Sequence, residues 1–151
     1  MKTESANADH ELVAAVTISI VVPAYNEQET LPEFHRRLAS VMNDLAANWE
    51  VIYVNDGSSD MTPEVIGDLA RSDPHVVFLD LSRNFGKEIA MTAGLDYAGG
   101  DAVVLIDADL QDPPELIVDF VREWRSGGVD VVFGKRRSRG GESTMKKLTA
   151  H

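Results

Sequence analysis

Short apolar runs alternate with amphipathic segments along the whole chain, and this alternation constrains the fold more than any other feature. The apolar runs cover residues 17–23, 49–54, 75–81, 101–106 and 129–133. They are short and rich in β-branched residues, which is typical of buried strands. Strands that are separated by helices pair in parallel, with right-handed crossovers. The sequence therefore predicts an α/β fold, with a Rossmann-like, mostly parallel sheet and helices on both faces.

The segments between these runs carry helix signals. Two pairs have the spacing of a capping box, Thr30 with Glu33 and Asp112 with Glu115. Thr62 is expected to cap another helix, with Pro63 at its first position. The helix expected over 86–98 is apolar nearly all round, so we expect it to be buried.

Asp107 and Asp109 follow directly after the apolar run 103–106, and a helix signal comes soon after them. In an open α/β sheet, ligands bind at the carboxyl ends of the strands. Two carboxylates there suit Mg²⁺ or Mn²⁺, and such a metal usually also holds substrate phosphates. An Asp-x-Asp alone is common in loops, but this strand–helix context favours a phosphorylated ligand that is bound through a divalent cation.

Polar clusters follow the other predicted strands as well. These clusters are 23–27 (PAYNE), 55–60 (NDGSSD), 83–87 (RNFGK) and 134–136 (GKR). Parallel strands bring such loops to one edge, so together they predict a site. Taken singly, each has a plainer interpretation: Asn55-Asp56-Gly57 as a turn, Tyr25 as a half-buried aromatic, and Arg83 and Lys87 as surface charges.

Composition excludes several classes of protein. The net charge of −11 argues against a nucleic-acid partner, and the absence of cysteine excludes disulfides and thiolate chemistry. No window is apolar enough to span a membrane, and residues 1–15 resemble a flexible leader rather than a signal peptide. Residues 134–151 carry six basic side chains and one acidic one, so they suit either an anionic lipid surface or a solvated tail.

Two nucleotide-binding fingerprints and a histidine site are also excluded. Neither the P-loop pattern nor the dinucleotide Gly-x-Gly-x-x-Gly pattern follows the first strand. The four histidines are scattered without the spacing of metal ligands, so we interpret them as structural or exposed.

In this order, the clusters resemble the family 2 glycosyltransferases of the GT-A fold. The matching segments are VPAYNE (22–27), NDGSSD (55–60), RNFGKE (83–88), GLDYAGGD (94–101), DADLQDPPE (107–115) and GKR (134–136). Within that family the chain is most similar to the polyprenyl-phosphate sugar transferases, the dolichol-phosphate mannosyltransferase and bactoprenol glucosyltransferase group. The resemblance implies a catalytic domain over 16–137. It also implies a basic tail over 138–151 that leads to a membrane-associated region lacking from this chain.

The resemblance also implies roles for individual residues. Asp107 and Asp109 match ligands of the metal and the diphosphate, with Gln111 beside them as a further metal ligand. Arg136 matches an arginine that meets the diphosphate or the lipid phosphate and is counted with the two aspartates as catalytic. Contacts to the donor are expected from Pro23, Tyr25, Glu27, Val54, Asp56, Lys87 and Ala108, besides Asp107, Asp109 and Gln111.

The function implied is that of a metal-dependent inverting transferase. It would move a sugar from a nucleotide-sugar donor to a polyprenyl-phosphate lipid at the cytoplasmic face of the membrane. Asn55 stands where many relatives have aspartate, which favours the glucosyl branch and UDP-glucose as the donor. The oligomeric state stays open, a homo-oligomer included.

Three other functions remain open. One is a family 2 enzyme that glycosylates a saccharide hydroxyl in polysaccharide or cell-envelope synthesis. Another is a donor-binding fragment without turnover. A haloacid-dehalogenase-type phosphatase also places Asp-x-Asp after an apolar strand. Leu110 after the pair, and the late position of the pair in the chain, disfavour this last alternative.

Overall fold

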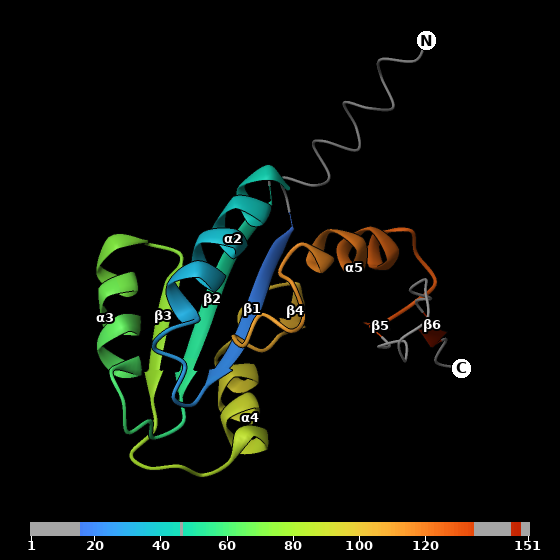
Figure 1. The fold of residues 1–151 in the computed structure, drawn as a ribbon. Coiled ribbons are helices and arrows are strands. Elements are labelled where there is room, and N and C mark those ends of the chain that lie inside the picture. The colour runs from blue at the N-terminus through green and yellow to red at the C-terminus, as the bar shows by residue number, and fades with distance from the viewer. Residues whose placement is uncertain (1–15, 46, 135–145, 149–151) are drawn as a thin grey trace, which may run out of the picture. The chain divides into compact units, whose positions relative to one another are not determined.

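The structure is a computed structural model that describes residues 16–45, 47–134 and 146–148. The chain divides between Pro114 and Glu115 into two compact units. Figure 1 labels the elements of both units. The expected leader over 1–15 lies outside the described residues, as does most of the expected basic tail.

The first unit is built on a four-stranded parallel sheet in the order β3-β2-β1-β4 (Figure 1). Its strands are β1 Thr17–Ala24, β2 Asn48–Asn55, β3 Val76–Asp80 and β4 Ala102–Leu105. The predicted α/β fold with a parallel sheet is confirmed. The strand order reverses between β1 and β4, which are neighbours in the sheet although β2 and β3 lie between them in sequence. The topological switch point of the sheet therefore lies between β1 and β4.

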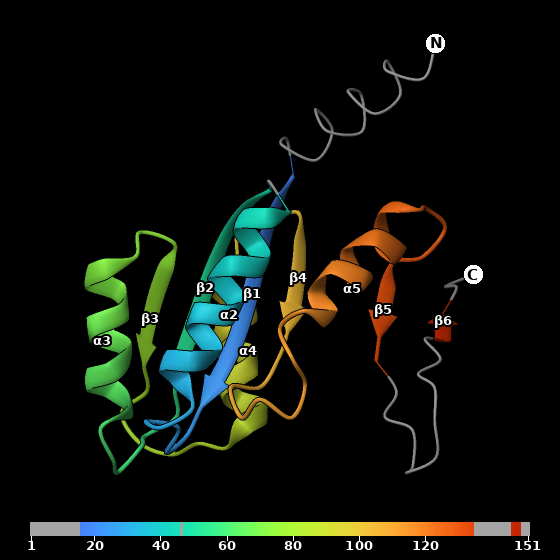
Figure 2. The same cartoon turned by 45° about the horizontal axis from the view of Figure 1, so that its top comes forward.

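Three helices cover the two faces of this sheet, as Figures 1 and 2 show. They are α2 Leu31–Asp44, α3 Thr62–Ser72 and α4 Lys87–Tyr97. Helix α2 lies on one face, where its Phe34 packs edge-on against Tyr53 with ring centroids 6.4 Å apart. Helix α4 lies on the other face, where Ala90 joins a core cluster with Val21 and Val54.

Helix α4 approaches the sheet closely at Gly94. A Cβ atom on Gly94 would lie 2.3 Å from Cγ1 of Val21, closer than real side chains pack, and 3.2 Å from Cγ2 of Val54, which is also tight. The absence of a side chain at Gly94 therefore sets the spacing between this helix and the sheet.

The expectation that this helix, apolar nearly all round, is buried is wrong. Ile89, Leu95 and Tyr97 are exposed, and only Ala90 and Gly94 are fully buried among its residues. The physical reason is that α4 meets the sheet through a narrow face of small residues, so its larger apolar side chains point elsewhere.

Strand β4 is also less buried than its apolar sequence predicts. It lies at an edge of the sheet, and its side chains Val103 and Leu105 are 40% and 48% exposed. The register places them beside Ser19 and Val21, on the face that α4 covers. Because α4 is centred on β1 and β2, that face stays open over β4.

The capping box predicted at Thr30 is not formed. Helix α2 has no side-chain hydrogen bond at its N-cap residue Thr30, and in α5 (Leu116–Arg125) the N-cap residue is Glu115 rather than the predicted Asp112. The Thr30 hydroxyl donates instead to Oε2 of Glu27, at 2.7 Å. Helix α5 begins at Leu116, after the proline pair rather than within it. At Thr30 a partner within the preceding turn has therefore replaced the one that the spacing rule predicts.

The cap predicted at Thr62 is also different in the structure. Helix α3 begins at Thr62 with Met61 as its N-cap residue, and the Thr62 N–H donates to Oδ1 of Asp60 at 2.9 Å. The Thr62 hydroxyl is therefore left to accept a hydrogen bond from another loop, as described below.

The second unit contains α5, β5 (Val131–Phe133) and β6 (Lys146–Leu148). We expected residues 129–133 to form a fifth parallel strand, and this is wrong. Strand β5 pairs antiparallel with β6 in a separate two-stranded sheet. Gly127 and Gly128, both with φ of +82°, follow the end of α5 and reverse the chain, as their sequence predicts.

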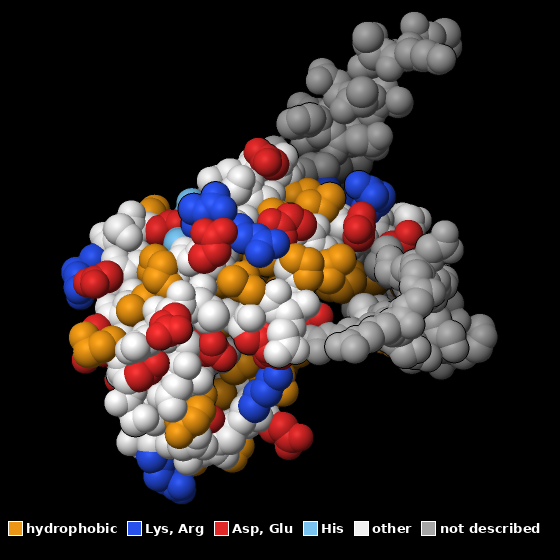
Figure 3. Space-filling model, viewed as in Figure 1, with side chains coloured by type: hydrophobic (Ala, Val, Ile, Leu, Met, Phe, Trp, Pro, Cys, Tyr) orange, Lys and Arg blue, Asp and Glu red, His pale blue; other side chains and the backbone are white. Residues whose placement is uncertain are grey.

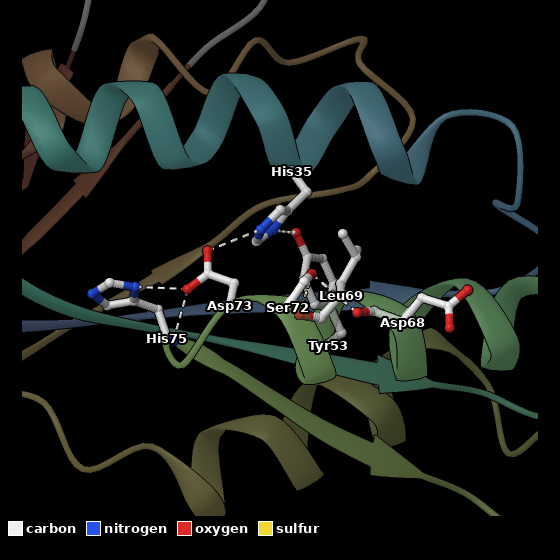
Figure 4. A network of polar contacts seen from close by, with 7 residues as sticks. All are labelled: His35, Tyr53, Asp68, Leu69, Ser72, Asp73 and His75. Atoms are coloured by element: carbon white, nitrogen blue, oxygen red, sulfur yellow. Dashed lines mark hydrogen bonds and ion pairs between the residues drawn. The ribbon is translucent and has the colours of Figure 1, made fainter.

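A buried polar network joins α2, β2 and the turn before β3 (Figure 4). His35 lies 2.9 Å from the Tyr53 hydroxyl through Nδ1 and 3.1 Å from Oδ2 of Asp73 through Nε2. The neutral tautomer with its proton on Nε2 satisfies both partners, because the tyrosine then donates and the carboxylate accepts. Burial lowers the pKa of His35 and outweighs the raising effect of Asp73. His35 is therefore a structural residue, as the sequence predicts.

His75 completes this network. Its Nδ1 lies 2.8 Å from Oδ1 of Asp73, and its ring stacks on Trp49 with centroids 4.1 Å apart. Both His75 and Trp49 stand at the amino ends of their strands. The network therefore runs from His75 and Asp73, at the amino ends of the strands, to His35 and Tyr53 beneath α2.

The outer surface is mixed in charge. Figure 3 shows acidic and basic side chains interspersed on one face, and exposed i,i+3 ion pairs such as Arg36 with Glu33 contribute to this pattern. Within the described residues, no helix is both long enough and apolar enough to cross a membrane.

Candidate functional site

Four loops follow the four parallel strands, and all four leave the same edge of the sheet (Figure 2). They are the first loop (residues 25–30), the second loop (56–61), the third loop (81–86) and the fourth loop (106–114). The first and fourth loops follow β1 and β4, so they flank the topological switch point, where open α/β sheets bind their ligands.

Backbone strain marks these two loops. Asn26 and Leu110, with φ of +53° and +61°, are the non-glycine residues with positive φ in the described part of the chain. Asparagine tolerates this conformation, whereas leucine does so at an energetic cost. Such strained positions cluster at functional sites, and here both lie beside the switch point.

The first and second loops are tied together by hydrogen bonds. The Asn26 side-chain oxygen accepts the Ser59 N–H at 2.8 Å, and the Asn26 N–H donates to Oγ of Ser58 at 3.0 Å. The Glu27 N–H donates to the Thr62 hydroxyl at 2.8 Å. These contacts fix the course of the chain after Tyr25.

A second set of contacts strengthens this connection. Oε1 of Gln28 accepts the Met61 N–H at 2.8 Å, and the Gln28 N–H donates to Oδ2 of Asp60 at 3.3 Å. Desolvation raises the pKa of Asp60, but hydrogen bonds from Thr62 and Gln28 outweigh it, so the pKa lies below its usual value. Sequence reasoning missed the roles of Asn26, Gln28 and Thr62, although an asparagine in a loop just after a strand is a signal for positive φ.

A small open hollow of about 190 Å³ lies between these two loops. Its lining includes Glu27, Glu29 and Asp60. The hollow is smaller than a typical ligand pocket, and three carboxylates disfavour a phosphate there. We therefore do not place a diphosphate in this hollow.

The second and third loops are clamped together by Asp56. This side chain is 3% exposed, and its two oxygens accept the backbone N–H groups of Phe85 at 2.7 Å and Gly86 at 3.0 Å. Gly57 supports the same contact, because a Cβ atom there would lie 2.2 Å from the backbone nitrogen of Asn84. The Asp56–Gly57 clamp therefore fixes the backbone that leads into α4.

Lys87 is the first residue of α4, and its ammonium group lies 2.5 Å from Oδ2 of Asp107. The side chains of Lys87 and Asp107 are 57% and 31% exposed, so the pair is accessible to solvent. In the fourth loop, Oδ1 of Asp109 accepts the Gln111 N–H at 2.9 Å. The structure therefore brings Asp56, Lys87 and Asp107 into one connected arrangement.

The carboxylates of the fourth loop fit a divalent cation of the kind that brings its own ligands. Among the described residues, no three His, Cys, Asp or Glu side chains are arranged to hold a metal. Asp107 and Asp109 can each offer oxygen, and Mg²⁺ and Mn²⁺ are commonly bound by one or two carboxylates, with water and substrate phosphates completing the shell. The residues present suit a metal that arrives with a phosphorylated ligand.

Two exposed aromatic side chains stand at the same edge. Tyr25 is 48% exposed, and Phe85 is 37% exposed with the Arg83 guanidinium 4.1 Å from its ring centroid. An exposed aromatic ring at a loop offers a flat surface on which a base can stack.

Other predicted contact residues lie elsewhere. Pro23 is buried in β1, and Val54 is fully buried in the core under α4, so neither side chain lines the open edge. Ala108 is buried in the fourth loop. Arg136 lies outside the described residues. The roles assigned to all these residues stay predictions.

Comparison with known proteins shows to which family this chain is similar. The model of Glycosyl transferase family 2 matches residues 19–151. An uncharacterized glycosyltransferase of Synechocystis sp., sll0501, is 50% identical over 135 residues, which are 89% of this chain and 42% of that protein. The bactoprenol glucosyl transferase of Shigella phage SfV is 46% identical over 133 residues, which are 88% of this chain and 43% of that protein.

The fold has solved counterparts. A mannosyltransferase from Pyrobaculum calidifontis, in complex with GDP-Man and Mn²⁺, superimposes with a TM-score of 0.58 at 26% identity. The match covers 74% of this chain and 33% of that one. The chain thus spans less than half the length of the relatives and of this counterpart. The resemblance in sequence and the GT-A fold are both confirmed, and the chain belongs to glycosyl transferase family 2.

Proposed function

We propose that this chain carries the donor-binding part of a metal-dependent inverting transferase. The enzyme moves a sugar, glucose from UDP-glucose, to a polyprenyl phosphate. The observation that carries the proposal is the contact between Lys87 and Asp107 beside the switch point of the sheet, in a loop that also contains Asp109. Its support from sequence is the 46% identity to a bactoprenol glucosyl transferase.

The donor is held by its two ends in this proposal. Tyr25 stacks on the base, and the Asp56 carboxylate, which can accept more hydrogen bonds than the two it has, contacts the nucleoside. Asp107 and Asp109, with Gln111 beside them, hold Mg²⁺ or Mn²⁺. When bound, the metal supplies a Lewis acid that offsets the negative charge on the departing diphosphate. Lys87 adds a fixed positive charge next to that group.

The reaction then needs no protein base. A phosphate monoester has its second pKa near 6, so the lipid phosphate is largely ionised at neutral pH. Its oxygen bonds to the anomeric carbon as the bond to the diphosphate breaks, so the configuration inverts and the nucleoside diphosphate leaves. In the described part of the chain, both histidines have Asp73 as a partner in the structural network, and neither lies in one of the four loops. This placement supports an acceptor that is already ionised.

We further propose that the acceptor is reached at the cytoplasmic face of a membrane. Six basic residues and one acidic residue between 134 and 151 support this, since each lysine or arginine near an anionic surface adds about 1 kcal/mol to binding. Arg136 belongs to this group, and we assign it to the diphosphate or the lipid phosphate.

Calorimetric binding of UDP-glucose tests the proposal, first with Mn²⁺ and then with a chelator. We expect binding only with the metal, and loss of that binding in Asp109→Asn. The matched control is Asp68→Asn, which removes an equally charged but exposed side chain on α3. If Asp109→Asn bound UDP-glucose normally with Mn²⁺, the assignment of the metal site would be wrong. Release of UDP with a polyprenyl phosphate but not with a free saccharide would identify the acceptor class.

A further inference from the structure

The ion pair between Lys87 and Asp107 places a cation on the carboxylate that is expected to hold the metal. The ammonium lies 2.5 Å from Oδ2 of Asp107, so one of the two metal-binding side chains already has a cationic partner. An ammonium group and a divalent ion on the same carboxylate would repel each other. The two cations therefore compete for the same carboxylate.

Contacts with the second loop hold the backbone that precedes Lys87 in place. The Gly86 N–H is held by Oδ2 of Asp56 at 3.0 Å, and Gly57 allows the third loop to lie directly against the second. Lys87 therefore extends toward Asp107 from an anchored backbone, while its side chain, 57% exposed, keeps the freedom to turn away.

The position of Lys87 in its helix is also electrostatically unfavourable for a lysine. Lys87 is the first residue of α4, where the helix dipole favours a negative charge and disfavours a positive one. Asp107 offsets this unfavourable position in the structure. A bound diphosphate would offset it as well, because anions bind favourably at helix amino ends.

We propose that Lys87 occupies the cation position at Asp107 until a metal–diphosphate complex arrives, and then turns to the diphosphate. The inference rests on the proposed function, because it takes Asp107 as a metal ligand. The ligand that the site accepts is then the metal complex of a nucleoside diphosphate rather than the free cation. The diphosphate provides what a free cation lacks: further oxygen ligands for the metal and a new partner for Lys87.

A consequence is positive coupling between metal and nucleotide. If the nucleoside diphosphate removes Lys87 from Asp107, it raises the affinity for Mn²⁺, and by linkage Mn²⁺ raises the affinity for the nucleotide by the same factor. Removal of the Lys87 charge should strengthen binding of Mn²⁺ alone and reduce this coupling.

Electron paramagnetic resonance of free Mn²⁺ measures this in the 151-residue chain, first with the ion alone and then with UDP. Lys87→Gln should bind Mn²⁺ alone about threefold more tightly than the unaltered chain, as expected for the loss of an exposed ion pair. UDP should then raise its Mn²⁺ affinity by a smaller factor than in the unaltered chain. Lys87→Arg, which keeps the charge, should bind Mn²⁺ as the unaltered chain does.

The matched control is Arg71→Gln, which removes one positive charge from the exposed pair with Asp68 on α3. It should leave both Mn²⁺ affinities unchanged, because Arg71 is remote from the fourth loop in the sequence and in the sheet order. If Lys87→Gln and Arg71→Gln increased Mn²⁺ affinity equally, the effect would be one of net charge and the inference would be overturned.

Two other outcomes separate the inference from the proposed function. If Lys87→Gln binds Mn²⁺ no more tightly than the unaltered chain while UDP still promotes Mn²⁺ binding in both, the metal site stands and the role of Lys87 is refuted. If UDP and Mn²⁺ do not bind the unaltered chain together at all, the proposed function and the inference both fail.

Discussion

The carboxylate of Asp56 holds the backbone of Gly86 at 3.0 Å, although the two residues are 30 positions apart in the chain. A second bond from the same carboxylate, to the Phe85 N–H, makes this side chain the link between the second and third loops. Because Lys87 follows Gly86 directly, the link also determines where the first residue of α4 can extend.

Asp56→Asn should weaken this link. The amide keeps one acceptor but turns a donor toward a backbone N–H, so one buried group loses its partner. We expect the free energy of unfolding to fall by about 1–3 kcal/mol, measured by urea denaturation. Asp68→Asn, at an exposed position, should change it by less than about 0.5 kcal/mol. Equal stability of Asp56→Asn and the unaltered chain would show that the clamp contributes little.

Leu110→Asn should make the protein more stable. Leu110 has a φ of +61°, a conformation that asparagine adopts at lower cost than leucine. We expect the free energy of unfolding to rise by about 0.5–1 kcal/mol, measured by urea denaturation, because the same loop conformation then costs less. Leu95→Asn, on the exposed side of α4, provides the comparison and should not stabilise the chain. A loss of stability in Leu110→Asn would contradict this prediction.

Gly94→Ala and Gly67→Ala should have opposite effects, although both glycines lie within helices. A Cβ at Gly94 would lie 2.3 Å from Cγ1 of Val21, so α4 must move, at a cost of about 1–3 kcal/mol. A Cβ at Gly67 would meet only the flexible end of Arg71, at 3.5 Å. There, alanine should add about 0.5–1 kcal/mol through its helix propensity. Thermal unfolding of the two variants distinguishes them, and a tolerated Gly94→Ala would refute the tight packing.

Stability should fall as the pH drops from 7 toward 5. Burial holds the pKa of His35 below its ordinary value of 6.5, so the unfolded chain binds the more protons in this range. Protonation therefore favours the unfolded chain once the pH falls below 6.5, and the stability that the neutral imidazole contributes at higher pH is lost. Urea unfolding at a series of pH values measures this effect.

The variant His35→Gln identifies the source of that dependence. It should be less stable at pH 7, because Tyr53 and Asp73 lose their imidazole partner, and its stability should vary less with pH between 7 and 5. If the slope were the same in both proteins, another group would be responsible.

The sequence by itself determined the succession of elements and the chemistry of the loops. Alternating periodicities located β1 to β4 and α2 to α4 to within a few residues, because strand and helix periods depend on neighbouring residues alone. The motifs after each strand, such as Asp107 with Asp109, were enough for the family to be recognised. Parallel pairing then required these loops to share one edge.

Tertiary structure decided which side chains meet. The edge position of β4, the exposed side of α4 and the pairing of β5 with β6 depend on packing between distant segments, which periodicity does not encode. From the sequence alone, Lys87 could have been a surface charge. Only the order of the strands in the sheet brings its ammonium group to the carboxylate of Asp107. The capping rule failed at Thr30 for a different reason, since Glu27, three residues earlier in the chain, accepts the hydrogen bond from its hydroxyl.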